Sequence, residues 1–307
     1  MATRLGLLLG LSALAVSPLG PTAATARLNE ARLAMPEGYV AYKCGDSLCL
    51  ARPDGMKHRL LLSGGHRPWP QWDPAFAPNG RLIAFRGYYA PGDGSYALYI
   101  MGTNGCAAKR LTQSIAGTPS WSPDARWIAF DMSGAGEIWK VRADGTHPTR
   151  LARSDLAASP SWSPGGATIA FTRTSHARGQ IWTVHPDGRG ARLLHTDALV
   201  GDQMAQPAWS HDGRRIAFVA QAGKRAVIKI MRADGADVQV LTKRFPGAWN
   251  PVWLPHDSGI AFLTGPVAFG PGTLFVMRRD GSRTRRLARL KTEQLAWSSS
   301  PLPPRSC

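Results

Sequence analysis

The chain has 307 residues, a formal net charge of +17, and hydrophobic residues at 44% of its positions. That apolar share supports a packed core and excludes a chain that is disordered throughout, while 33 glycines and 24 prolines favour many turns. The length allows one large domain or two ordinary ones. A strong positive field attracts polyanions, so the position of the charges bears on the choice of partner.

The first 26 residues have the pattern of a secretory signal. Arg4 supplies the positive start, residues 5–16 supply the apolar segment, and Ala24-Thr25-Ala26 supplies a small-residue cleavage site. We therefore expect export to the periplasm or secretion, with residues 27–38 as a leader before the first domain. An uncleaved membrane anchor is the alternative, although the apolar run is short for a membrane span.

From residue 39 onwards the chain repeats itself, which is the signature of a repeat architecture. An Asp-Gly or Asn-Gly turn and a basic, Leu-rich segment follow each copy of one triplet. An aromatic residue precedes all but the first triplet, at Phe76, Trp121, Trp162, Trp209 and Trp253. The triplets, spaced 41–47 residues apart, are Val40-Ala41-Tyr42, Ile83-Ala84-Phe85, Ile128-Ala129-Phe130, Ile169-Ala170-Phe171, Ile216-Ala217-Phe218 and Ile260-Ala261-Phe262.

Each repeat predicts four short strands, named A to D in chain order. In strand B the large residues share one face and alanine takes the other, because side chains alternate, and this suits sheets stacked face to face. Six such units predict an all-β, six-bladed β-propeller with four-stranded antiparallel blades over residues 39–299. We expect the strand A tryptophans to pack between blades.

The first unit has no strand A of its own. Leu295-Ala296-Trp297-Ser298-Ser299, near the C-terminus, has the missing pattern. We therefore expect this strand to join the first blade and close the ring, which removes exposed sheet edges. A Pro-rich tail over residues 300–307 follows it.

The repeated Trp-Ser-Pro-Asp, Ile-Ala-Phe, Ile-Trp and Arg-Ala-Asp-Gly sequences resemble the TolB-type propeller repeat. The same repeat forms the propellers of prolyl-oligopeptidase-like peptidases. The resemblance covers residues 39–299 and implies the propeller fold. TolB proper carries an α/β domain before its propeller, which the short segment before the first blade leads us not to expect here. The family role is periplasmic, in contact with outer-membrane lipoprotein and colicin-type partners.

Sequence motifs give little support for catalysis. The chain has no room for the catalytic domain of prolyl-oligopeptidase relatives, and it contains no Gly-x-Ser-x-Gly nucleophile turn. The histidines and cysteines show no His-x-x-x-His or Cys-x-x-Cys spacing, so we expect neither a metal nor a cofactor. His211 and His256 fall at predicted A–B turns and are interpreted as turn residues. A His-lined metal site, as in polysaccharide lyases with TolB-like propellers, is the alternative.

The four cysteines are predicted to form two disulfides, because export places them in an oxidising compartment. Cys44 and Cys49 flank the first B–C hairpin at a separation that suits a disulfide. Cys106 follows the C–D turn of the second blade, and the tail is long enough to bring Cys307 to the same face. This second bridge would lock the ring closure from outside. Free thiols, or an intermolecular bond through Cys307, are the alternatives.

The B–C and D–A connections share one face of a propeller, called here the loop face, while the A–B and C–D turns lie on the opposite turn face. These connections vary between copies, and function usually lies in such loops. Aromatic and basic residues there have the composition of binding hot spots, although packing of the aromatics against the propeller is an equal alternative. The candidate binding residues are His66, Arg67, Trp69, Trp72, Arg86, Tyr88, Tyr89, Arg173, His176, Arg178, Arg225, Arg244, Phe245 and Trp249.

The sequence thus predicts a monomeric, non-enzymatic scaffold that binds a protein or peptide of the cell envelope over the loop face. An enzyme acting on a polysaccharide or peptide at that face is one alternative, and a binder of anionic envelope polymers is another. Most other basic residues fall on strand D, the outer edge, where charge discourages edge-to-edge pairing. Nucleic acid is not expected, because its binding needs a continuous basic track.

Overall fold

The computed structural model describes residues 37–62, 69–88, 96–112, 116–132, 134–154, 156–175, 178–198, 206–222, 225–245, 247–265, 272–290, 292 and 294–298. The chain divides into two compact units, residues 1–34 and 35–307, and every described residue belongs to the second. The predicted signal segment, most of the leader and the tail lie outside the described residues. Within the described part, no helix has the length and apolarity needed to cross a bilayer.

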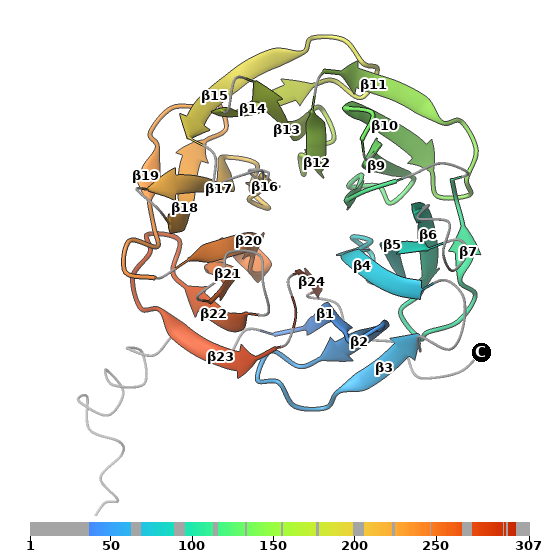
Figure 1. The fold of residues 1–307 in the computed structure, drawn as a ribbon, viewed down its shortest axis with the longest axis horizontal. Coiled ribbons are helices and arrows are strands. Elements are labelled where there is room, and N and C mark those ends of the chain that lie inside the picture. Colours follow the sequence, from blue (N-terminus) through green and yellow to red (C-terminus); the bar gives the residue numbers. More distant parts are fainter. Residues whose placement is uncertain are drawn as a thin grey trace, which may run out of the picture. The chain divides into compact units, whose positions relative to one another are not determined.

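The described residues form six four-stranded antiparallel sheets arranged around a centre, as Figure 1 shows. The predicted six-bladed propeller is therefore confirmed. A short 3-10 turn, η1 (Pro255–Asp257), lies between two strands of the sixth blade. From the centre outwards, blade 1 contains β24 (Leu295–Ser298), β1 (Tyr39–Cys44), β2 (Ser47–Ala51) and β3 (Arg59–Leu62); blade 2 contains β4 (Trp69–Phe76), β5 (Leu82–Tyr88), β6 (Tyr96–Gly102) and β7 (Lys109–Arg110); blade 3 contains β8 (Pro119–Trp121), β9 (Trp127–Met132), β10 (Glu137–Arg142) and β11 (Thr149–Arg153). Blade 4 contains β12 (Ala157–Trp162), β13 (Ile169–Ser175), β14 (Arg178–Val184) and β15 (Arg192–Ala198); blade 5 contains β16 (Ala208–Trp209), β17 (Arg215–Ala222), β18 (Arg225–Arg232) and β19 (Gln239–Val240); blade 6 contains β20 (Ala248–Trp253), β21 (Ile260–Thr264), β22 (Thr273–Met277) and β23 (Arg285–Arg289).

The C-terminal strand closes the ring as predicted. β24 pairs antiparallel with β1, with Val40 opposite Trp297 and Ala41 opposite Ala296. β1 therefore has a partner on each side, because β2 occupies its other edge. This pairing joins the two ends of the repeat and leaves β1 without an open edge.

The small residue of each strand B lets neighbouring blades approach closely. All six triplet alanines have an exposed fraction of 0%. Ala129 of blade 3 packs in one cluster with Ile169 and Phe171 of blade 4, and Ala170 of blade 4 packs with Ile216 and Phe218 of blade 5. The alanine face of one blade thus receives the large residues of the next, as the alternation in strand B predicts.

Two of the strand A tryptophans, Trp121 and Trp253, pack between blades as expected. Trp121 is 6% exposed and Trp253 is 4% exposed. The indole nitrogen of Trp121 donates a hydrogen bond to the carbonyl oxygen of Ala75 at 3.0 Å, and that of Trp253 donates to Ala208 at 2.9 Å. Each bond reaches strand A of the preceding blade, so these residues align the inner strands around the centre.

The strands extend farther towards the loop face than predicted. Trp69 and Trp72 were expected in a loop, but they lie in β4, while Arg86 and Tyr88 lie in β5. The reason is continued pairing past the triplet, with Trp69 opposite Tyr88 and Tyr88 opposite Tyr96. Several of the remaining candidate binding residues likewise lie within strands: Arg173 in β13, Arg178 in β14, Arg225 in β18 and Trp249 in β20.

The alanine contact between blades is open to a direct test. We expect Ala170→Leu to lower the free energy of unfolding by about 1–3 kcal/mol, because it adds methylene groups to a closed interface. Leu193→Ala on the same sheet is the control, since Leu193 is 45% exposed and its loss should change the stability by at most about 0.5 kcal/mol. Denaturant unfolding measures both, and equal effects would contradict tight packing at Ala170.

Candidate functional site

The inner strands of the six blades surround a central cavity of about 230 Å³. At its loop-face end, six polar residues occupy equivalent positions, each three residues before the aromatic residue of strand A. These residues, called here the polar ring, are Asp73, Thr118, Ser159, Gln206, Asn250 and Gln294. A proline follows each of the first five. The cavity therefore combines a polar rim with walls of proline and small side chains.

Proline accounts for the interrupted strand pairing next to the polar ring. Proline has no N–H to donate to the sheet, so regular pairing is interrupted where it stands. The register shifts between Trp72 and Ala75 in β4, and equivalent shifts occur in β12 and β20. Four ring residues have a positive φ: 52° at Asp73, 49° at Ser159, 43° at Gln206 and 54° at Asn250. Such backbone strain costs about 1–3 kcal/mol per residue and is concentrated at ligand sites in proteins.

Side chains of the polar ring satisfy the backbone of the next blade. The N–H of Asn250 donates to Oε1 of Gln206 at 2.9 Å, and the N–H of Leu295 donates to Oδ1 of Asn250 at 2.7 Å. The N–H of Asp73 donates to Oε1 of Gln294 at 3.0 Å. These bonds link blades 5, 6, 1 and 2 in sequence around the cavity. They provide acceptors for backbone N–H groups that have no partner in the interrupted sheet.

A buried carboxylate takes the same role in blades 3 and 4. Oδ1 of Asp131, in β9, accepts the N–H of Thr118 at 2.8 Å and that of Ser159 at 3.3 Å. Gly117 makes room for it, because a Cβ at that position would collide with the Asp131 carboxylate. Asp131 thus joins two neighbouring blades at the rim of the cavity.

The negative charge of a second buried acid, Asp73, affects the pKa of Asp131. Burial and, to a smaller extent, the charge of Asp73 raise the pKa of Asp131 from 3.8 to about 6, against the opposing effects of Arg86 and the N–H groups of Thr118 and Ser159. Burial also raises the pKa of Asp73, while Arg86 and the hydrogen bond of Gln294 lower it. Nε of Arg86 lies 3.1 Å from Oδ2 of Asp73, whose side chain is 3% exposed. The rim therefore contains two buried carboxyl groups and one guanidinium that partly compensates them.

The Arg86 side chain connects this rim to an aromatic pair on blade 2. Its guanidinium carbon lies 5.0 Å from the centre of the Tyr96 ring. Tyr88 and Tyr96 stack with ring centres 4.3 Å apart, and their hydroxyl groups share a hydrogen bond of 2.6 Å. Arg86 and Tyr88 were both candidate binding residues, and the structure brings them together. We call Arg86, Tyr88 and Tyr96 the blade 2 ledge.

Two of the predicted binding aromatics support the fold from inside instead. Trp249 is 0% exposed, with Gly247 and Gly272 close to its ring, so it packs inside blade 6, and a contact with a ligand stays a prediction. Phe245 packs edge-on against Phe262 and Phe275, with ring centres 5.1 and 5.2 Å away. The apolar neighbours in blade 6 explain both placements.

Of the other candidate binding residues, the structure describes the side chains of only some. Arg173 lies over the ring of Trp182 at 5.1 Å, and Arg225 and Arg244 are exposed. His66, Arg67, Tyr89 and His176 lie outside the described residues, as do the side chains of Trp69, Trp72 and Arg178. For these residues a binding role stays a prediction.

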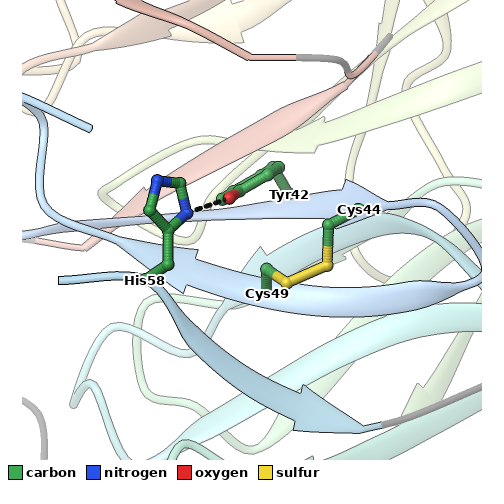
Figure 2. The surroundings of a disulfide bond; sticks show 4 residues. All are labelled: Tyr42, Cys44, Cys49 and His58. Atoms are coloured by element: carbon green, nitrogen blue, oxygen red, sulfur yellow. Dashed lines mark hydrogen bonds between the residues drawn. A yellow bond between two sulfur atoms is a disulfide. The ribbon is translucent and has the colours of Figure 1, made fainter. Parts of the chain in front are cut away.

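The first predicted disulfide is present. Cys44 and Cys49 are bonded across the hairpin between β1 and β2, with a Cα separation of 5.9 Å, as Figure 2 shows. In the same blade the Tyr42 hydroxyl is hydrogen-bonded to Nδ1 of His58, and burial raises the pKa of Tyr42. Cys106 also belongs to a disulfide. Its predicted partner, Cys307, lies outside the described residues, so that pairing stays a prediction.

Histidine on the turn face stabilises a turn. Nδ1 of His211 lies 3.0 Å from Oδ1 of Asp257, which also accepts the N–H of His211 at 2.8 Å. Oδ2 of Asp257 accepts the N–H of Asp212 at 2.8 Å. The interpretation of His211 as a turn residue agrees with these bonds. Among the described residues, no group of three or more His, Cys, Asp or Glu side chains could hold a metal ion.

Sequence reasoning missed the polar ring, although a signal for it exists. A polar residue precedes proline in five of the six strand A segments, from Asp73-Pro74 to Asn250-Pro251. The repeat pattern drew attention to proline and tryptophan and left this position unexamined. Asp131 has no such signal, because it follows the strand B triplet in one blade only.

Comparison with known proteins agrees with this architecture. A family model described as the TolB beta propeller domain matches residues 65–196 and 133–301. This chain belongs to the TolB beta propeller family. The crystal structure of TolB from Acinetobacter baumannii is similar to it with a TM-score of 0.69 and 23% identity, over 85% of this chain and 66% of that chain. The resemblance of the repeat to that of TolB is thereby confirmed for the fold.

Two curated relatives match parts of this TolB-type propeller. An uncharacterized protein of Agrobacterium fabrum is 31% identical over 104 residues, which is 33% of this chain and 33% of that protein. The uncharacterized peptidase YuxL of Bacillus subtilis is 39% identical over 84 residues, which is 24% of this chain and 12% of the peptidase. The matches thus span a third or less of each relative's own length.

The raised pKa of Asp131 predicts a pH-dependent stability. Because its folded pKa of about 6 lies above the ordinary 3.8, this group favours folding fully below pH 3.8, and that contribution is lost as the pH rises through about 6. Asp131→Asn keeps an oxygen for the two N–H groups but cannot ionise. We expect it to match wild type at acidic pH and to be more stable at pH 8, by up to about 3 kcal/mol. Denaturant unfolding at both pH values measures the difference.

Asp280→Asn is a control with the opposite sign. Hydrogen bonds from Ser282 lower the pKa of Asp280, so its ionised form stabilises the fold and this contribution falls as the pH falls. Asp280→Asn should therefore have a lower free energy of unfolding than wild type at pH 8, and this difference should be smaller at acidic pH. An unchanged pH dependence in Asp131→Asn would show that Asp131 does not titrate near pH 6.

Proposed function

We propose that this TolB-type propeller is an exported, non-enzymatic scaffold that binds a protein or peptide of the cell envelope at the loop-face end of its cavity. The observation that carries the proposal is the polar ring around a cavity of about 230 Å³, next to the blade 2 ledge. Concave sites with a few well-placed polar groups are where proteins bind ligands. Loops and strand ends on a rigid scaffold are also the usual location of binding residues.

The chemistry of the rim suits a polypeptide. The amide oxygens of Gln206 and Asn250 are used on backbone N–H groups, so their NH₂ groups are the donors that a ligand carbonyl would meet. The prolines of strand A offer apolar walls for a side chain. The ledge adds tyrosine and arginine, the residue types that contribute most to binding hot spots. A bound segment would lie across blade 2 with one end or side chain in the cavity.

The disulfides support export of the protein. Cys44–Cys49 is bonded and Cys106 belongs to a disulfide, and such bonds persist in oxidising compartments. The secretory pattern over residues 1–26 supports the same compartment. We therefore place the proposed partner among periplasmic or secreted proteins.

A catalytic role at the same mouth has weaker support. Asp131, with a pKa of about 6, has the acidity of a general acid or base. However, it is 6% exposed, and its Oδ1 accepts two backbone N–H groups. The name of the peptidase YuxL applies to that protein, and the match covers 12% of it. The arrangement of Asp131 therefore favours a role in holding the rim together.

Affinity capture from envelope extract tests the proposed site. We expect the captured protein to be lost with Tyr88→Ala, which removes one of the two stacked tyrosines of the ledge, and with Thr118→Tyr, which narrows the cavity at the polar ring. Losing one hot-spot aromatic costs about 2 kcal/mol or more, which is at least about a thirtyfold loss of affinity. Quantitative mass spectrometry of the eluates measures the change.

The control is Leu193→Ala, on the outer strand of blade 4 and away from the cavity. It should capture the same protein as wild type. All three variants must show the wild-type unfolding midpoint within a few degrees. If Tyr88→Ala and Thr118→Tyr both retain the wild-type set of captured proteins, the proposed site is wrong.

A further inference from the structure

Part of the basic rim has a structural role between blades. Nη2 of Arg59, on β3, donates to the carbonyl oxygen of Asn104 at 2.6 Å, and Nζ of Lys109, on β7, donates to that of Asp144 at 2.7 Å. Each acceptor belongs to the C–D turn of the next blade. Gly105 of such a turn has a φ of 93° and lies against the backbone of Leu61 in the preceding blade. The turns thus rest on the outer strand of the neighbour, and a basic side chain caps them.

The C–D turns differ strongly in charge, which the structural role does not explain. Blade 6 has five arginines and one aspartate between positions 278 and 286. Blade 1 has Arg52, Lys57 and Arg59 with one aspartate over positions 52–59. The equivalent segment of blade 5, residues 232–239, has one arginine and two aspartates. The positive charge is therefore largest in blade 6, and blade 1 keeps a net positive charge, as does blade 2 with Lys109 and Arg110.

Ring closure brings the C–D turn of blade 1 against β23, the outer strand of blade 6. A Cβ built on Gly55, in the C–D turn of blade 1, would lie 3.0 Å from Cβ of Ala288 in β23. Figure 1 shows the β2–β3 connection beside β23. Two exposed basic residues lie on this turn and one lies on β23, and two more lie on the C–D turn of blade 6, whose Gly281 is close to Leu241 of blade 5. We call them, with Met56 and Leu60, the basic seam: Arg52, Lys57, Arg279, Arg283 and Arg286.

The two aspartates next to the seam accept backbone hydrogen bonds within their own turns. Oδ1 of Asp54 accepts the N–H of Met56 at 2.8 Å, and Oδ1 of Asp280 accepts the N–H of Ser282 at 2.8 Å. These bonds fix the turn conformation and direct one carboxylate oxygen of each residue towards the backbone. The five basic side chains outnumber these two carboxylates, so the seam has a net positive charge.

Two exposed apolar side chains lie within the basic seam. Met56 is 64% exposed and Leu60 is 46% exposed. Met56 stands on a fixed turn, because Gly55 N–H donates to the Arg52 oxygen at 2.8 Å and Arg52 N–H donates to the Met56 oxygen at 2.9 Å. The bond between Tyr42 and His58, seen in Figure 2, ties the end of this turn to β1. Leu60 points away from the blade 2 side, because it alternates with Arg59 and Leu61.

We propose that the basic seam binds an anionic lipid surface. Clusters of four to eight basic residues bind acidic lipid headgroups, and an apolar side chain among them adds affinity by entering the boundary with the acyl chains. A soluble anionic polymer would use the charges but would offer nothing to Met56 and Leu60. The seam lies on the outer strand and turn face, so the loop-face cavity stays accessible when it is occupied. This inference is independent of the proposed function.

Vesicle sedimentation of the full exported chain tests the seam. We expect binding to phosphatidylcholine vesicles with about one third phosphatidylglycerol and none to pure phosphatidylcholine. Each removed charge should lower the partition coefficient about fivefold, so Lys57→Gln/Arg279→Gln/Arg286→Gln should lower it about a hundredfold. Met56→Ser/Leu60→Ser should lower it about tenfold with all charges kept. Salt at about 0.5 M should weaken binding to the acidic vesicles through screening.

Matched controls lie on the opposite side of the ring. Arg126→Gln/Arg189→Gln/Arg192→Gln removes the same number of exposed charges from blades 3 and 4, and Leu193→Ser removes an apolar residue equivalent to Leu60. Both should bind the acidic vesicles as wild type does. Equal losses in seam and control variants, or no binding by wild type, would overturn the proposal. It would also be overturned if wild type and Met56→Ser/Leu60→Ser bound the vesicles alike while dextran sulfate competed fully, because charge alone would then explain binding.

Discussion

Face-to-face packing of blades is the constraint on which the rest of this structure depends. Each sheet is four strands wide and has an apolar side towards both neighbours, so none of them is stable alone. The alanine of strand B allows this contact in blades 1 to 5, because it makes a flat surface for the isoleucine and phenylalanine of the next blade. Closure by β24 extends the same contact around the whole ring. The side chains between blades are therefore used for packing. The polar and charged residues that could bind a ligand lie at the cavity rim and on the outer strands.

The cavity rim follows from a conflict between proline and the sheet. Proline at strand A interrupts pairing, and the neighbouring N–H groups then need other acceptors. Gln206, Asn250 and Gln294 supply them across the blade boundary. Asp131 supplies them in blades 3 and 4, at the cost of a buried carboxyl group whose pKa rises to about 6. The polar ring thus holds blades in register and, by the same arrangement, lines a site that can receive a ligand.

The outer strands show how one repeated feature can serve two purposes. A basic residue that caps the turn of the next blade explains Arg59 and Lys109. It does not explain why arginines gather in blade 6 and why Met56 is exposed among them. Positions that are shared by all copies of the repeat build the scaffold. Residues that differ between copies are therefore the better candidates for binding. The two proposed surfaces lie on different faces of the scaffold, so they can act together or separately.

The repeat pattern by itself determined the six blades, the order of their strands and the closure by Leu295–Ser298, because period and alternation encode strands directly. It also determined the short-range disulfide between Cys44 and Cys49. Only the tertiary structure decided that Trp249 is buried, because that depends on neighbours in strands β21 and β22. Likewise, the charge of Asp73 in blade 2 acts on Asp131 in blade 3, and Gly55 approaches Ala288 only through ring closure. Contacts between distant positions carry no local signature, since no periodicity within one strand records which residue of another blade will face it.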